Sequence, residues 1–276
     1  MTGGTGFPYD ANILTETGPG AKRFVNEGAG RPGRPLTDVY FYLTVVAFLA
    51  GFIQGLSGFG SVLLSLPLLA LFLDIREAIP LVNLMGVILT VILIIQLRAH
   101  WEWGKIWPLL AGATLGIPAG VWLLKRMDPV HVQVVLGVVL LAYSLYGLLF
   151  KLPIGKLGGP WAYLFGFFAG GLGGAISASG PPVIVYTSLQ AWTKDQIKVT
   201  LQGFFIMSGL LIGVFHAASG LVTDGVIRNF LVSVPTLLAG TWVGSLLYGK
   251  FREEGYRRVM LVLLGALGVF TLTRVL

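Results

Sequence analysis

The chain has 276 residues, of which 55% are hydrophobic and only 11% charged, with a formal net charge of +7 and no cysteine. Soluble domains carry about 25% charged residues, so this composition excludes a soluble enzyme. It also excludes disulfides, thiolate catalysis and cysteine-based metal sites, and three scattered histidines do not suggest a metal centre. The cations lie in short segments between apolar runs, which argues against nucleic acid as a partner and favours lipid headgroups.

Residues 1–37 differ from the rest of the chain in composition. They hold eight glycines and four prolines, and they contain no apolar run preceded by cations. A signal peptide needs that arrangement, and a spanning helix needs about 20 apolar residues. We therefore expect residues 1–37 to form a mobile soluble tail.

Short charged segments divide the remainder into apolar runs. Stretches without Asp, Glu, Lys or Arg occupy residues 39–73, 78–97, 106–124, 129–150, 157–193, 199–223, 229–249 and 259–273. Since about 20 apolar residues cross a bilayer as one helix, the sequence predicts an all-α polytopic protein embedded in the lipid bilayer. Ordinary spans are expected near 78–97, 106–124, 131–150, 199–219, 228–247 and 258–275.

Two of the runs, 39–73 and 157–193, are too long for one crossing. Glycine interrupts the first at residues 55–60 (GLSGFG) and the second at residues 170–174 (GGLGG), with SGPP following at 179–182. Glycine and proline at this density remove helical hydrogen bonds, and the freed backbone groups need partners in protein or in a water-filled cavity. Each run therefore predicts a broken helix in the protein interior.

Internal similarity indicates a duplication. Phe52, Gly55, Leu56 and Gly58 recur 116 residues later within residues 168–174. Residues 76–79 (REAI) return as 194–197 (KDQI), and residues 109–112 (LLAG) return 128 residues later as 237–240 (LLAG). These blocks predict two homologous repeats, 38–150 and 160–275, each a broken helix followed by three spanning helices. Counts of Lys and Arg in the loops do not distinguish inverted from parallel repeats, and we expect inverted ones.

Small residues recur at helical spacing in both halves. They are Gly112, Gly116 and Gly120 in the first half and Gly240 and Gly244 in the second. Such spacing lets two helices approach closely.

Because no charged residue lies inside an apolar run, neutral groups must form any site at membrane depth. A half-helix that follows a break begins with N–H groups that lack an intrahelical partner, and such groups bind anions. Two breaks meeting at the repeat interface predict a site for a small anion near the bilayer midplane. The expected binding residues are Gln54, Ser57, Gly58, Gly60, Ser61, Asn83, Ser177, Ser179, Gly180 and Gln202. Hydrogen bonding to helix backbone is the alternative role for each serine.

The same segments carry a family resemblance. Residues 55–60 (GLSGFG), reaching Pro67, and residues 171–175 (GLGGA) through SGPP at 179–182 resemble the two signatures of the TauE/SafE family of anion exporters. The resemblance covers about residues 40–275. It implies a bacterial inner-membrane secondary transporter, not an enzyme and without a cofactor, that exports sulfite or an organosulfonate such as sulfoacetate. Ser177 stands where glycine is usual, and Lys198 stands where arginine is expected.

Two further functions fit parts of the sequence. Residues 55–58 (GLSG) match the GxSG of rhomboid intramembrane proteases, with Ser57 as nucleophile and His216 as its base. The position matching Ser57 in the second half is Gly173, so the duplication argues against a protease. An anion channel is the other alternative.

In a transporter, His216 is instead the candidate for proton coupling, because the apolar runs hold no carboxylate. The sequence leaves homo-oligomer formation open.

Overall fold

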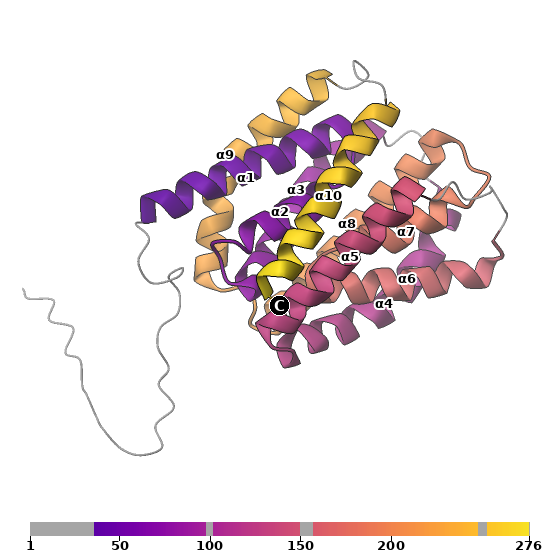
Figure 1. The fold of residues 1–276 in the computed structure, drawn as a ribbon. Helices are drawn as coiled ribbons and strands as arrows, with labels where there is room; N and C mark the ends of the chain where they lie inside the picture. The colour runs from indigo at the N-terminus through magenta and orange to yellow at the C-terminus, as the bar shows by residue number, and fades with distance from the viewer. Residues whose placement is uncertain (1–35, 98–101, 150–156, 248–252, 276) are drawn as a thin grey trace, which may run out of the picture.

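The computed structural model describes residues 36–97, 102–149, 157–247 and 253–275, and every regular element among them is a helix (Figure 1). In chain order the helices are α1 (Leu36–Ser57), α2 (Ser61–Leu69), α3 (Ile75–Leu97), α4 (Trp103–Arg126), α5 (Pro129–Leu149), α6 (Gly159–Ile176), α7 (Gly180–Ser188), α8 (Lys194–Ala218), α9 (Asp224–Leu247) and α10 (Glu253–Val275). Nearly all of the predicted tail, residues 1–35, lies outside the described residues.

Seven of these helices are long and apolar enough to cross a membrane: α1, α3, α4, α5, α8, α9 and α10. The predicted all-α polytopic membrane protein is therefore confirmed. The six ordinary spans begin slightly earlier than predicted. In all of them except α5 the first turn contains charged residues, which lie outside the predicted spans. Arg76, Lys105 and Asp224 are examples.

The two overlong runs form broken helices, α1 with α2 and α6 with α7. The first break lies at residues 58–60, within the predicted stretch. The predicted interruption at residues 170–174 is wrong: α6 continues to Ile176, because Gly170 and Gly174 pack against the backbone of α4, and the second break lies at residues 177–179. Between α1 and α2, Gly58 (φ 80°) and Gly60 (φ 95°) adopt left-handed backbone conformations, which glycine tolerates because it lacks Cβ. After α6, Ser177 (φ 54°) is the one non-glycine residue with positive φ in the described part of the chain. A left-handed residue ends a helix and redirects the chain. Each break is therefore followed by a separate nine-residue helix.

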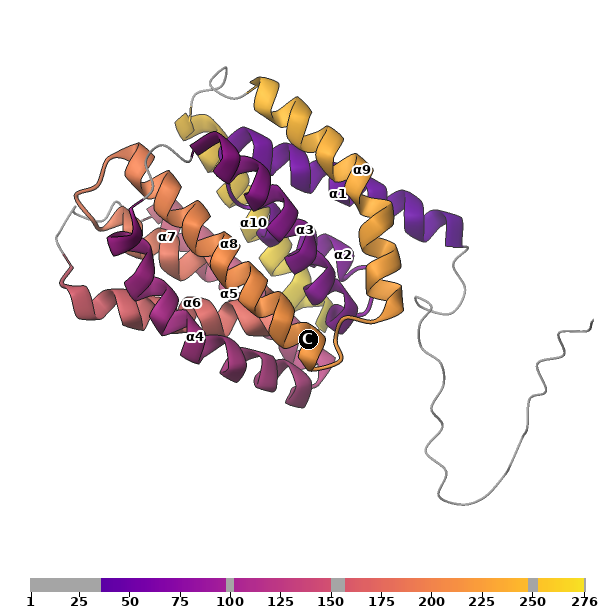
Figure 2. The same cartoon turned by 180° about the vertical axis from the view of Figure 1, so that it is seen from behind.

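Glycines bring α4 against α6 and α9 against α1 at backbone contact distance. A Cβ added at any of the five predicted packing glycines would lie 2.0–2.2 Å from a carbonyl oxygen of the neighbouring helix. For Gly112, Gly116 and Gly120 the carbonyls belong to Tyr163, Phe167 and Gly171; for Gly240 and Gly244 they belong to Phe48 and Phe52. The predicted close approach is confirmed, and Figure 2 shows α4 beside α6 and α1 beside α9 from behind.

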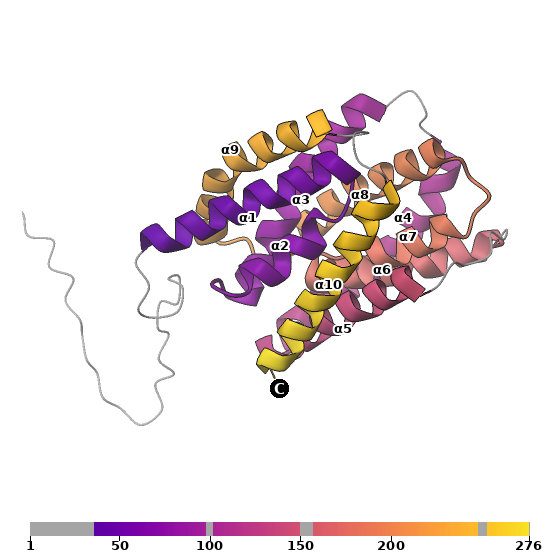
Figure 3. The same ribbon diagram turned by 45° about the horizontal axis from the view of Figure 1, so that its top comes forward.

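The order of such contacts gives the helix directions. Along α4 and α6 the facing residue numbers rise together, so these helices are parallel, as are α9 and α1. On α5, Gly137 faces Leu272 and Gly147 faces Leu261 of α10, so this pair is antiparallel. The pair α3 and α8 is also antiparallel, because Gly209 faces Val87 and Gly213 faces Asn83. Figure 3 shows α1 beside α9 and α5 beside α10.

The glycine contacts between α1 and α9 can be compared, position by position, with those between α6 and α4. Gly55 of α1 faces the Thr241 carbonyl on α9, and Gly170 of α6 faces the Ala113 carbonyl on α4. Ala113 and Thr241 have the 128-residue spacing found in the sequence, whereas Gly55 and Gly170 are 115 residues apart. The contacts thus pair Gly55 with Gly170, one residue away from the Gly55–Gly171 match at a spacing of 116 in the sequence. Residue identity in a glycine-rich run does not reveal which glycine faces the neighbouring helix.

We expect Gly116→Ala to destabilise the protein. Its Cβ would lie 2.1 Å from the Phe167 carbonyl oxygen, so α4 and α6 must separate, and overpacking of this kind costs about 1–3 kcal/mol. The measurement is the thermal unfolding midpoint of the purified protein in detergent. Gly104→Ala on the same helix is the control, because no atom lies within 4 Å of its added Cβ. Equal midpoints for the two variants would contradict the tight α4–α6 interface.

Candidate functional site

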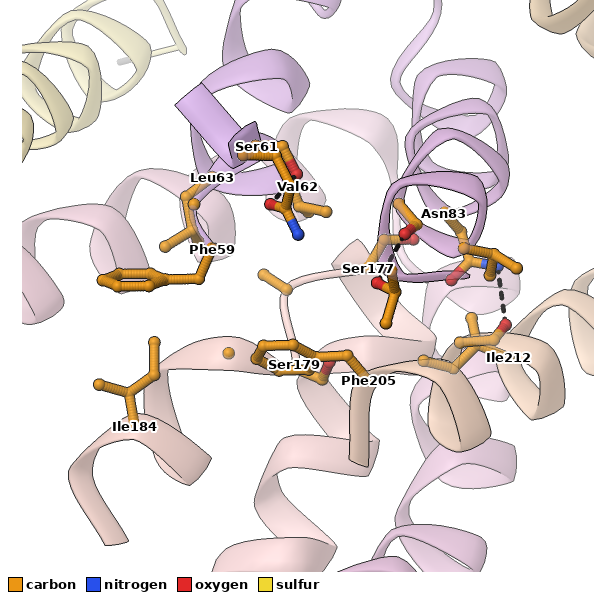
Figure 4. A pocket seen from close by; sticks show the side chains of 18 residues that line it. Phe59, Ser61, Val62, Leu63, Asn83, Ser177, Ser179, Ile184, Phe205 and Ile212 are labelled. Atoms are coloured by element: carbon orange, nitrogen blue, oxygen red, sulfur yellow. Dashed lines mark hydrogen bonds between the residues drawn. The ribbon is translucent and has the colours of Figure 1, made fainter. Parts of the chain in front are cut away.

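A cavity of about 70 Å³ lies where the two breaks meet α3 and α8. Liquid water occupies about 30 Å³ per molecule, so the space fits a small ion and is far below the size of drug-sized ligand pockets. In Figure 4, Ser61 and Val62 lie across the cavity from Ser179 and Ile184, with Asn83 and Ile212 on a third side. The predicted residues that line it are Gln54, Gly60, Ser61, Asn83, Ser177, Ser179 and Gly180.

The amino end of α2 forms one wall of the cavity. Gly60 is the N-cap and has no side chain to bond the first helical N–H groups, while Leu64 N–H is the first to bond back, to the Gly60 carbonyl. The N–H groups of Ser61, Val62 and Leu63 therefore have no intrahelical acceptor. All three residues line the cavity, so this wall offers backbone donors and the positive end of a helix dipole.

Gln54, on the last turns of α1, adds a side-chain donor to the same wall. It is 4% exposed, and its Oε1 accepts a hydrogen bond from the Ser61 hydroxyl at 2.8 Å. Because Oε1 is the acceptor, the amide NH2 is the end of Gln54 that remains to donate. The Ser61 hydroxyl thus orients Gln54, and its own proton does not point into the cavity.

The opposite wall, at the start of α7, offers fewer backbone donors than expected. Pro181 and Pro182 occupy the second and third helical positions and have no N–H, so Gly180 supplies the one free N–H of the first three positions. Ser179 is the N-cap, yet its hydroxyl makes no capping bond. With no hydrogen bond to another described residue, that hydroxyl is a donor available to the cavity.

Two other predicted residues line the cavity but donate elsewhere. The Ser177 hydroxyl donates to the Ile79 carbonyl of α3 at 2.9 Å. The Asn83 amide donates to the Gly209 carbonyl of α8 at 3.0 Å. These hydrogen bonds join the second break to α3 and join α3 to α8. Ser177 therefore bonds helix backbone, the alternative role expected for each serine. Asn83 retains one amide N–H for another acceptor.

The remaining predicted residues do not line the cavity. Gln202 donates its amide N–H to the Gly58 carbonyl at the first break, and the Ser57 side chain lies outside the described residues. His216 is fully buried, with Nε2 2.9 Å from the Gly174 carbonyl of α6. The imidazole is thus engaged with backbone, an arrangement that does not favour the Ser57–His216 protease alternative.

Sequence reasoning missed part of the lining, although helical periodicity contains the signal. On α3, the lining face that contains Asn83 continues through Gly86, Val87 and Thr90. On α8, helical spacing from Gln202 leads to the lining residues Phe205, Gly209 and Ile212. Phe59 and Ile184 complete an apolar side of the cavity. Among the described residues that line it, none is Asp, Glu, Lys or Arg.

A group of charged and polar contacts lies at the starts of α4 and α8, outside the cavity lining. Lys105 at the start of α4 bonds Glu102 at 2.6 Å and lies over the Trp192 ring, and Gln196 of α8 donates to Glu102. The hydrogen bond from Lys105 is the main reason that the pKa of Glu102 lies below its ordinary value. These contacts join the start of α4 to the start of α8.

Comparison with known proteins agrees with this architecture. The chain matches the family described as "Sulfite exporter TauE/SafE" over residues 43–271. It is also 25% identical over 173 residues to the "Probable sulfite/organosulfonate exporter TauE" of Cupriavidus necator, covering 61% of this chain and 68% of that protein. No solved structure matches the chain. Since the family match covers most of the chain, the protein belongs to the TauE/SafE family of membrane transporters, which are not enzymes.

Proposed function

We propose that this chain exports a small sulfur oxyanion, sulfite or an organosulfonate such as sulfoacetate, across the inner membrane through the cavity between the two breaks. The observation that supports this site is the convergence of donors without any competing carboxylate. These donors are the N–H groups of Ser61, Val62 and Leu63, the Gln54 amide, the Ser179 hydroxyl and the Gly180 N–H.

Neutral donors suit a transported anion. A hydrogen bond to a charged acceptor contributes about 1.5–3 kcal/mol, and the α2 dipole adds to it. Several such bonds hold an oxyanion in a space of about 70 Å³. Because no lysine or arginine is among the described lining residues, the anion is not trapped by a fixed ion pair, and a carrier must release what it binds.

We also propose that the repeats are inverted. Matching helices from the two halves pack antiparallel, α3 with α8 and α5 with α10, which supports a two-fold axis perpendicular to these helices and therefore in the membrane plane. Both α3 and α8 line the cavity, so the axis passes near it. Alternating exposure of the cavity then follows from rocking of one half against the other.

The proposal is tested by Ser179→Ala. Loss of one donor to a charged acceptor is expected to reduce sulfite or sulfoacetate efflux from proteoliposomes about tenfold, without loss of folded protein. Counterflow of the labelled anion is the best assay, because a carrier shows it and a channel does not.

Ser177→Ala is the matched control in the same break. Its hydroxyl donates to the Ile79 carbonyl, so this variant is expected to lower thermal stability while changing the apparent KM less than Ser179→Ala does. Unchanged counterflow in Ser179→Ala, at equal reconstituted protein, would remove Ser179 from the site. Absence of counterflow in the unaltered protein for every sulfur oxyanion would contradict the proposed function itself.

A further inference from the structure

His216 occupies the point where α6 loses its helical hydrogen bonding. The Gly174 carbonyl would normally accept from the N–H four residues later, at Ala178, but α6 ends at Ile176 and Ser177 turns the chain. The Nε2 atom of His216 lies 2.9 Å from this carbonyl. A carbonyl accepts only, so Nε2 carries the proton and donates.

The other ring nitrogen has no such partner. Nδ1 of His216 is buried and has no hydrogen-bond partner within the part of the chain that the structure describes. A proton on Nδ1 would place an unpaired charge in the interior, which is costly. Helix α6 (Gly159–Ile176) and the stretch of α4 from residue 106 to 124 contain no Asp, Glu, Lys or Arg to offset it. Helix α3, which also packs against α8, carries Arg76 and Glu77 in its first turn, but neither is a hydrogen-bond partner of Nδ1. The geometry thus favours a neutral imidazole.

A second side chain of α8 makes the corresponding bond at the first break. Gln202 is 3% exposed and donates its amide N–H to the carbonyl of Gly58, the left-handed residue that follows α1. Gln202 and His216 are 14 residues apart on one continuous helix, which corresponds to about 21 Å. A single rigid helix therefore holds both breaks.

We infer that Gln202 and His216 are positioning residues, through which α8 holds the ends of α1 and α6 and so places the donors of α2 and α7. This inference rests on the proposed anion site for its effect on transport. It assigns His216 a fixed structural bond in place of the proton-coupling role expected from the sequence. It also assigns Gln202 a role outside the cavity lining.

The test compares His216→Gln with His216→Leu. Glutamine presents an N–H at about the reach of Nε2 but does not titrate, so it is expected to retain efflux within about twofold and the unaltered pH profile. Leucine leaves the Gly174 carbonyl buried without a donor, and efflux is expected to fall about tenfold. Ser208→Ala is the control on α8, because the Ser208 hydroxyl bonds the Phe204 carbonyl of its own helix and not a break.

Amide hydrogen exchange supplies a readout that does not depend on the substrate. In His216→Leu, amide exchange at residues 175–180 is expected to rise about tenfold, while exchange in α9 stays unchanged. His216→Gln and Ser208→Ala are expected to exchange as the unaltered protein does. Gln202→Leu is expected to raise exchange at Gly58 and Leu64 instead, whose N–H groups bond the Gln54 and Gly60 carbonyls around the first break. Absence of transport in the unaltered protein as well as in the variants would contradict the proposed function, yet the exchange comparison would still decide the positioning role.

Two results would overturn the inference. One is unchanged exchange at residues 175–180 in His216→Leu. The other is loss of efflux or of its pH dependence in His216→Gln with normal exchange, which would show that titration of His216 drives transport.

Discussion

Replacing Gln54 by glutamate is expected to reduce anion export at least about a hundredfold. The substitution preserves the acceptor for the Ser61 hydroxyl, so the local packing at the end of α1 is retained. It replaces the amide NH2 with a carboxylate oxygen on the cavity wall, where Gln54 is 4% exposed. Two like charges about 4 Å apart repel by about 4 kcal/mol near a protein surface, which exceeds the 2.7 kcal/mol that a hundredfold change requires.

Gln190→Glu is the matched control for this charge change. Gln190 is also buried, at 8% exposed, but it is not among the residues that line the cavity. Efflux and the apparent KM of both variants are measured in proteoliposomes at pH 8, together with thermal stability in detergent. If Gln54→Glu transports as well as Gln190→Glu, the anion does not bind beside Gln54.

The positions of the breaks could be predicted from the sequence because they depend on local chemistry. Glycine and proline act on the backbone of their own segment, so residues 55–60 and 179–182 predict interrupted helices without any knowledge of the fold. The glycines at 170–174 do not interrupt α6, because Gly170 and Gly174 serve its close packing against α4. Ser177 adopts the left-handed conformation that glycine favours, and its hydroxyl bond to Ile79 supports it there.

The direction of each polar group could not be predicted, because its partner lies far away in the sequence. Asn83 bonds Gly209, Gln202 bonds Gly58 and His216 bonds Gly174. Each of these side chains satisfies a backbone carbonyl on another helix, which only the packed structure identifies. In a membrane interior such carbonyls require a donor, so buried polar residues are used for structure as readily as for substrate.

The sequence itself contains an asymmetry between the two breaks. Proline at 181 and 182 removes two of the first N–H groups of α7, whereas Ser61, Val62 and Leu63 of α2 keep theirs. Duplication suggested two equivalent half-helix ends. The chemistry of the two ends instead divides the proposed site into a backbone wall on α2 and a hydroxyl wall on α7.

Gly60→Ala tests the backbone wall directly. Gly60 has φ 95°, which a residue with a Cβ adopts only at a cost of about 1–3 kcal/mol, so the variant is expected to shift the first turn of α2. The backbone donors of Ser61, Val62 and Leu63 then no longer point at one anion. If this conformational cost is about 2 kcal/mol, efflux is expected to fall about thirtyfold, and the unfolding midpoint falls with it.

Gly180→Ala isolates the conformational effect, because Gly180 also lines the cavity but does not have a positive φ. The two added Cβ atoms would have similar room: the nearest atoms lie 3.8 Å away at Gly60 and 3.7 Å away at Gly180. Steric filling of the cavity would therefore affect both variants alike, whereas backbone strain affects Gly60→Ala alone. We expect the efflux of Gly180→Ala to stay within about threefold of the unaltered protein. A threefold change corresponds to about 0.6 kcal/mol, and this substitution adds no more backbone strain than that. Equal losses in the two variants would mean that cavity volume, and not the aim of the α2 donors, limits export.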